Sequence, residues 1–148
     1  MQNRASGFTL IEMVIVIVVG AILSGIALNT FQGVQGRAAA RQARQVFASL
    51  HARTRAIAIE RGEIVKLNVD QTNDSVWVDR GATRVETVRF GDELGVDIRG
   101  SGTLTLCMSP RGYAETNCNN FTSNQTIVFA AGGDTAAVEM RTMGQLRY

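Results

Sequence analysis

The chain has 148 residues, of which 45% are hydrophobic, 15 are Lys or Arg and 13 are Asp or Glu. This length suits one domain with an additional anchoring segment. The near balance of charge excludes nucleic-acid binding through a global basic excess, although all the bases except Lys66 are arginine.

The N-terminal segment is the most informative part of the sequence. The motif GFTLIE at residues 7–12 opens an apolar run, residues 13–28, that contains no charge. The run can cross about 30 Å of hydrocarbon at about 1.5 Å per residue, so we expect residues 8–30 to form a transmembrane or filament-core helix. A carboxylate near hydrocarbon costs about 3 kcal/mol. Glu12 should therefore be tolerated only beside a partner that neutralises it.

Two other interpretations of this segment stay open. The first is an ordinary secretory signal with Arg4 as its basic region and a cleavage site at residues 25–27, and the second is a plain single-pass anchor. An acid at the start of the apolar run is unusual for a secretory signal. Basic residues lie mostly after the run, so the positive-inside rule alone favours the opposite orientation.

Residues 37–61 are predicted to continue the helix as an amphipathic segment. Apolar residues recur there at helical spacing, and Gly62 is a suitable residue to end the helix. Glycines at positions 33 and 36 predict a flexible or partly melted hinge between the two parts. Six arginines indicate either a phosphate- or partner-binding stripe or a solvated face whose arginines pair with neighbouring subunits: Arg37, Arg41, Arg44, Arg53, Arg55 and Arg61.

The remaining residues, 63–148, have the alternation of β-strands. Residues 65–69 and 76–78 alternate around the turn residues 71–74, which predicts a β-hairpin. Further strands are predicted at residues 85–90, 96–98, 103–108, 126–129 and 136–141, and the asparagine-rich residues 117–124 are predicted to form a loop. The fold class is therefore α+β, with a long helix whose outer half packs against antiparallel sheet in a globular domain of residues 31–148.

No motif indicates catalysis, a metal or a cofactor. His51 is the one histidine, no visible motif assembles a Ser-His-Asp set around it, and no Cys/His cluster has the spacing of a metal site. We expect a protein that is not an enzyme. Three Asn-x-Ser/Thr triplets begin at Asn73, Asn120 and Asn124, and each is a weak signal by itself.

The N-terminal motif closely resembles the class III signal of type IV prepilins and type II secretion pseudopilins. The resemblance implies that residues 1–7 are a leader, that a prepilin peptidase cleaves between Gly7 and Phe8, and that the new amine of Phe8 is methylated. It also implies that Glu12 meets the terminal amine of a neighbouring subunit during assembly. The expected location is the inner membrane, with a single span, a periplasmic domain and later association with a filament.

Such a location predicts a disulfide between Cys107 and Cys118, because disulfides persist outside the cytoplasm. The bridge would stabilise the domain by about 3 kcal/mol in the chain-entropy model. Two unpaired buried thiols are the alternative.

The layout and the segment CMSPRG at residues 107–112 resemble the FimT/GspH family of minor pilins and minor pseudopilins. FimT-like members end in a Gly-Arg-x-Arg tail that helps to bind DNA. Here Gly144 and Arg147 match this tail, Gln145 replaces its first arginine, and Arg141 lies just upstream. Three hypotheses follow: a structural minor pilin, a DNA-uptake receptor of the pilus, and a pseudopilin that contacts exported protein.

Overall fold

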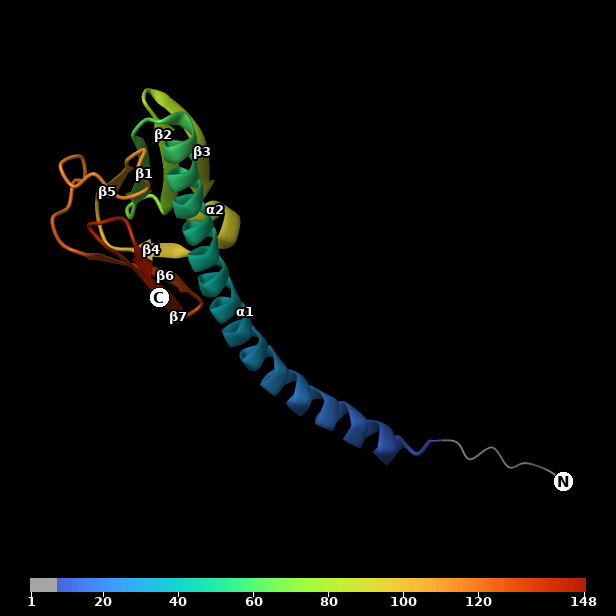
Figure 1. Ribbon diagram of the computed structural model, residues 1–148. Coiled ribbons are helices and arrows are strands. Elements are labelled where there is room, and N and C mark those ends of the chain that lie inside the picture. The colour runs from blue at the N-terminus through green and yellow to red at the C-terminus, as the bar shows by residue number, and fades with distance from the viewer. Residues whose placement is uncertain (1–7) are drawn as a thin grey trace.

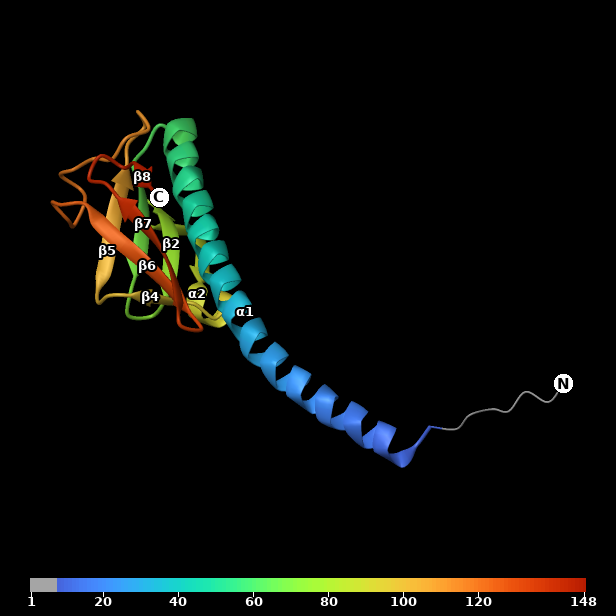
Figure 2. The same cartoon turned by 90° about the horizontal axis from the view of Figure 1, so that it is seen from below.

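The computed structural model describes residues 8–148, apart from the side chains of residues 26–32. Its main element is the helix α1 (Leu10–Arg61), which runs along a β-rich domain and projects from it (Figures 1 and 2). We call the projecting part, residues 10–35, the arm. The predicted α+β fold, with a long helix packed against antiparallel strands, is confirmed.

The strands form two four-stranded antiparallel sheets. The first has the order β3-β2-β1-β5 and the second the order β4-β6-β7-β8. The first sheet consists of β1 (Val65–Asp70), β2 (Ser75–Arg80), β3 (Thr83–Arg89) and β5 (Thr103–Met108). The second consists of β4 (Asp97–Arg99), β6 (Gln125–Ala131), β7 (Asp134–Met140) and β8 (Leu146–Arg147).

The expected hairpin is present as β1 and β2, which pair in antiparallel register with Val69 opposite Val76. Two elements were not predicted. The short helix α2 (Phe90–Leu94) begins where the strand pattern appeared to continue, and β8 near the C-terminus is only two residues long. Phe90 starts α2 because its side chain is fully buried, which turns the chain inward at that point.

The core lies between α1 and both sheets. Phe129 of β6 is at its centre, with ring centroids 5.7 Å from Phe47 of α1 and 5.5 Å from Phe90 of α2. The inward residues of the first sheet complete it, among them Leu67 of β1 and Leu106 of β5, both fully buried. A long helix without its own hydrophobic partner is marginal in water, so this packing is what stabilises the inner half of α1.

The predicted hinge at residues 33–36 is not seen as a break, because α1 continues through these residues. Gly36 is buried, and a Cβ atom placed on it would lie 2.6 Å from the carbonyl oxygen of Ala131. The glycine therefore allows the helix backbone to approach the β6–β7 turn. Arg37 adds an ion pair with Asp134 at 3.0 Å in the same place.

Candidate functional site

The N-terminal end of α1 is organised by Thr9 and Glu12. Thr9 is the N-cap in an extended conformation, and its hydroxyl accepts a hydrogen bond from the Glu12 backbone N–H at 3.3 Å. The Glu12 carboxylate accepts one in return from the Thr9 N–H at 3.4 Å. This capping box satisfies two helix N–H groups. It also fixes the carboxylate at the positive end of the helix dipole.

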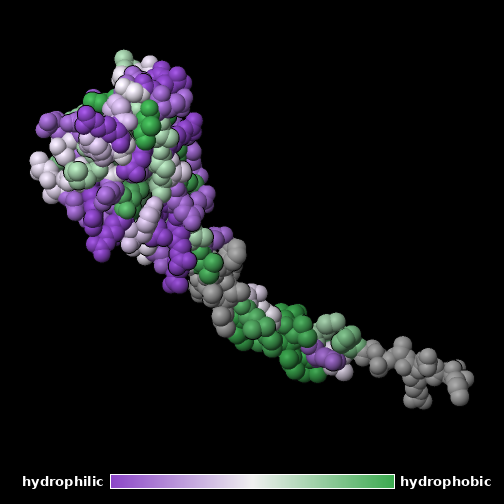
Figure 3. Space-filling view, viewed as in Figure 1, coloured by the Kyte–Doolittle hydropathy of each residue, from purple (hydrophilic) through white to green (hydrophobic). Residues whose placement is uncertain are grey.

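Between residues 10 and 25, the arm carries an almost continuous apolar surface. Its described side chains are exposed, including Leu10 at 82% and Ile17 at 71%. Figure 3 shows these hydrophobic residues along the arm, in contrast with the mainly hydrophilic surface of the domain. An exposed apolar surface of this extent marks a site that another molecule covers.

Some of the N-terminal predictions lie beyond the described residues. Residues 1–7, which hold the predicted leader, Arg4 and the Gly7 side of the cleavage site, are outside them. Within the part of the chain that the structure describes, no helix has both the length and the apolar character needed for a membrane crossing. The membrane segment predicted at residues 8–30 is thus not confirmed, and the side chains of residues 26–30 lie outside the described set.

The C-terminal residues form a turn that is docked on α1. The Gly144 N–H donates to the Arg141 carbonyl oxygen at 2.8 Å, and the Arg141 N–H donates to the Gln145 carbonyl oxygen at 2.9 Å. The Gly144 carbonyl oxygen then accepts from His51 Nε2 at 3.1 Å and from Arg55 Nη2 at 3.3 Å. Gly144 therefore has a structural role, in which its carbonyl group joins the turn to the helix.

His51 is buried and uncharged at neutral pH. Burial, reinforced by the positive charge of Arg55, lowers the pKa of His51 to about 4, against the opposing effect of its hydrogen bond to Gly144. A carbonyl oxygen can only accept, so the neutral ring carries its proton on Nε2. The single histidine of the chain is thus a packing residue, as its place on the amphipathic helix indicated.

The other residues of the predicted DNA-binding tail lie near Glu139. Arg147 of β8 pairs in register with Glu139 of β7, and Arg141 Nε lies 3.8 Å from the Glu139 carboxylate. The structure therefore brings Arg141 and Arg147 to one edge of the second sheet. The nearby carboxylate offsets part of their charge, while Gly144 is buried and bonds to α1 through its carbonyl oxygen.

The arginines of α1 serve mainly to attach the helix. Arg37 pairs with Asp134, and Arg53 pairs with Glu86 at 2.9 Å. The guanidinium of Arg44 lies over the Tyr148 ring, 5.4 Å from its centroid. These contacts favour the interpretation of the stripe as an ion-paired face, with the difference that its partners belong to the same chain.

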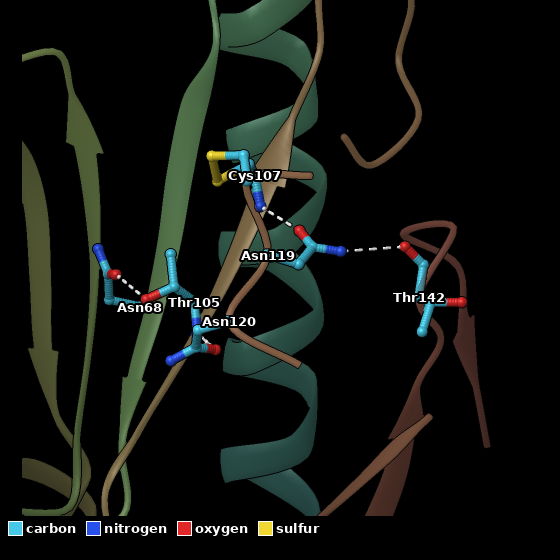
Figure 4. Close-up of a disulfide and its surroundings, with 7 residues drawn as sticks. Asn68, Thr105, Cys107, Asn119, Asn120 and Thr142 are labelled. Carbon is cyan, nitrogen blue, oxygen red and sulfur yellow. Dashed lines mark hydrogen bonds between the residues drawn. A yellow bond between two sulfur atoms is a disulfide. The ribbon is translucent and has the colours of Figure 1, made fainter. Parts of the chain in front are cut away.

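Cys107 and Cys118 form the predicted disulfide (Figure 4). The asparagine-rich loop that follows Cys118 is also more ordered than its composition indicated. Asn119 and Asn120 bond through their side-chain amides to the backbone of β5. Sequence reasoning did not find these contacts, because a run of asparagines predicts only a loop. The capping box of Thr9 had a readable signal, the Thr-x-x-Glu spacing before an apolar run.

All three Asn-x-Ser/Thr triplets have their asparagine side chains in use. Asn73 donates to Asp70 at 2.7 Å, Asn120 to Thr103 at 2.6 Å and Asn124 to Glu139 at 2.7 Å. Among the described residues, no group of three or more metal-ligating side chains comes together.

Comparison with known proteins identifies the N-terminal segment. Residues 2–28 match the family model of the prokaryotic N-terminal methylation motif. No curated protein and no solved structure matches the chain. The matched motif supports a type IV pilin-like or pseudopilin protein, and the fold of a helix on antiparallel sheets is consistent with that class. The motif implies processing by a prepilin peptidase and assembly with other pilin subunits, and it suggests a membrane anchor.

Proposed function

We propose that this protein is a minor pilin of a type IV pilus, of the FimT-like kind, that assembles through its N-terminal helix. The prepilin peptidase cleaves after Gly7, the amine of Phe8 is methylated, and residues 8–30 anchor the subunit in the inner membrane with the domain in the periplasm. The observation that carries the proposal is the exposed apolar arm with one carboxylate, Glu12, at its start.

The physical argument concerns the neutralisation of Glu12. Within residues 8–148, its carboxylate accepts one weak hydrogen bond of 3.4 Å, from Thr9. Once the arm is surrounded by other apolar helices, an unpaired carboxylate would be strongly unfavourable. A terminal amine of a neighbouring subunit supplies the opposite charge. Assembly is thereby favoured only for arms in the register that brings amine and carboxylate together.

Replacing Glu12 by alanine tests this mechanism. Glu12→Ala should still enter the membrane, because it removes a charge from an apolar segment, but its amount in purified filaments should fall at least about tenfold, for a lost pair of about 1.4 kcal/mol or more. Glu60→Ala is the matched control, since Glu60 is an exposed acid at the opposite end of the same helix. Normal incorporation of Glu12→Ala would refute the pairing.

The cleavage site has an independent test. Gly7→Trp should block the peptidase, and the full-length chain would then keep its leader and migrate as the larger form on a gel. Mature protein of normal size from this variant would exclude cleavage after Gly7.

A GspH-like minor pseudopilin of a type II secretion system is the alternative. The apolar arm and Glu12 serve both functions equally, and the two differ in what the domain contacts. Deletion of the gene should abolish pili in the first case and leave exported protein in the periplasm in the second. Pilus counts and secretion assays on one deletion strain distinguish them.

A DNA-binding role at the C-terminal edge is a second candidate, favoured by one observation. Arg147 and Tyr148 are exposed, and Tyr148 lies beside Arg44 of α1, so two arginines and an aromatic ring occur together. In gel-shift assays with the full chain, Arg147→Ala should weaken binding and lower the salt slope by about one unit. Unchanged binding of Arg147→Ala would exclude the tail as a DNA site.

A further inference from the structure

The two outer strands of the first sheet are protected in different ways. Strand β3 carries Arg84, Glu86 and Arg89, and its pairing with β2 has a register shift beside Val78. Charged side chains and bulges both hinder the addition of another strand. Strand β5 has the sequence TLTLCM, without a charge or a proline. If it were uncovered, the outer edge of β5 would therefore accept a further strand readily.

A short segment covers this edge in place of a strand. We call residues 114–120 the strap. The Asn120 side chain accepts from the Thr105 N–H at 2.7 Å and donates to the Thr103 carbonyl at 2.6 Å. The backbone N–H of Asn120 donates to the Thr105 carbonyl at 3.3 Å. At Cys107, the N–H donates to the Asn119 side chain at 2.9 Å, and the carbonyl accepts from the Glu115 N–H at 2.8 Å.

The strap thus satisfies the outward backbone groups of Thr105 and Cys107 completely. Two of these four hydrogen bonds come from asparagine amides, which imitate the peptide groups of a neighbouring strand. The strap also reaches the turn between β7 and β8, because Asn119 Nδ2 donates to the Thr142 carbonyl at 3.1 Å (Figure 4). One asparagine therefore joins the first sheet to a turn of the second.

The disulfide is the covalent link that holds the middle of the strap. The ends of the strap are anchored otherwise: Ala114 is buried and donates its N–H to the Met143 carbonyl oxygen at 3.1 Å, and Phe121 directly after the strap is buried. Residues 115–120 between them bury no apolar side chain. The link from Cys118 to Cys107 holds the asparagines directly opposite the backbone groups that they bond. Without this link, the middle of the strap would be held on β5 only by hydrogen bonds that water can replace.

We propose that the Cys107–Cys118 disulfide is a latch that keeps the strap on β5, and that without it the β5 edge pairs with the β5 edge of a second copy of this chain. An uncharged edge strand is self-complementary in antiparallel pairing, and a two-fold symmetric dimer uses the same strand from both copies. The latched strap is accordingly a device that keeps the subunit from associating through its sheet before it is assembled through its arm.

Amide hydrogen exchange on the full chain in detergent micelles tests the latch. In Cys107→Ala/Cys118→Ala, diluted until sedimentation shows only monomer because edge pairing would protect the same amides, the amides of Thr105 and of position 107 should exchange at least about tenfold faster. The amides of Leu104 and Leu106 are the internal control, because alternate residues of an antiparallel strand face the other neighbour, here β1. Unchanged protection at positions 105 and 107 would overturn the proposal.

Sedimentation of the same double variant tests the partner. It should show a concentration-dependent dimer that the wild type does not form under the same conditions. Adding Thr103→Lys, an exposed position on β5, should restore the monomer by placing a charge at the edge. A double variant that stays monomeric, or a dimer that persists with Thr103→Lys, would overturn the edge pairing.

If the double variant does not fold, a single substitution that keeps the disulfide tests whether the asparagines close the β5 edge. In Asn120→Ala, the Thr105 amide should exchange faster while the Cys107 amide, held by Asn119, keeps its rate. A Thr105 amide that keeps its wild-type exchange rate in this variant would show that the asparagines do not close the edge.

Discussion

His51 of α1 and Gly144 of the C-terminal turn are joined by a hydrogen bond of 3.1 Å from the imidazole Nε2 to the carbonyl oxygen. The two residues are 93 positions apart in the chain. Their contact fixes the last turn of the domain to the helix, while burial and the positive charge of Arg55 lower the pKa of His51 and keep the ring neutral. The stability of the domain should therefore depend on pH through this one group.

Lowering the pH from 7 to 5 should destabilise the wild type more than His51→Gln. The pKa of His51 is about 4 in the folded chain and about 6.5 in the unfolded chain, so between these values only the unfolded chain binds the proton. The stability that comes from keeping His51 neutral is fully present above pH 6.5 and is lost as the pH falls toward 4. At pH 5 the loss is about 2 kcal/mol. Urea unfolding followed by Trp77 fluorescence measures it. The same pH dependence in both proteins would contradict the assignment.

Gly144→Ala should destabilise the domain by about 3 kcal/mol. Gly144 has φ of 79°, and a Cβ atom there would lie 3.0 Å from the Ala114 backbone nitrogen. Gly81→Ala is the matched control, since its φ is 58° and a Cβ atom would meet nothing within 4 Å. The control should lose only the conformational part, about 1 kcal/mol. Thermal unfolding of the two variants compares them, and equal losses would show that the close contact with Ala114 has no effect.

Gly36→Ala and Gly33→Ala should change stability in opposite directions. Both residues lie inside α1, where alanine is favoured over glycine by about 1 kcal/mol. At Gly33 a Cβ atom would meet nothing within 4 Å, so this substitution should stabilise. At Gly36 it would meet the Ala131 carbonyl oxygen at 2.6 Å, so the helix must move away from the β6–β7 turn. Chemical denaturation measures both, and a stabilising Gly36→Ala would mean that this close approach is dispensable.

The sequence predicted the elements whose patterns are long and regular. The helix, its end at Gly62, the β1–β2 hairpin and the disulfide follow from periodicity, glycine punctuation and the expected compartment. It did not predict α2, because the alternation through Val88 continues to Phe90 and only tertiary packing turns that side chain into the core. Propensity is a weak guide where burial decides the local structure.

The candidate site was predicted unevenly for a related reason. Glu12 was singled out from its place in the motif, whereas its capping box with Thr9 was not predicted, although the Thr-x-x-Glu spacing is a local signal for it. The roles of Gly144 and Asn119 depend on partners far along the chain, and no local pattern shows which distant carbonyl or strand they will meet. A tail motif that resembles a ligand-binding sequence can therefore contain a residue that serves folding instead.

The unbroken course of α1 from the arm into the core has a geometric consequence. Because one helix carries both Glu12 and the residues that pack against the sheets, the direction in which the carboxylate faces is set by the number of residues between them. Inserting one residue in the arm would turn Glu12 by about 100° around the helix axis relative to the domain and move it by about 1.5 Å. The arm length thus determines which side of the globular domain faces outward when the carboxylate meets its partner.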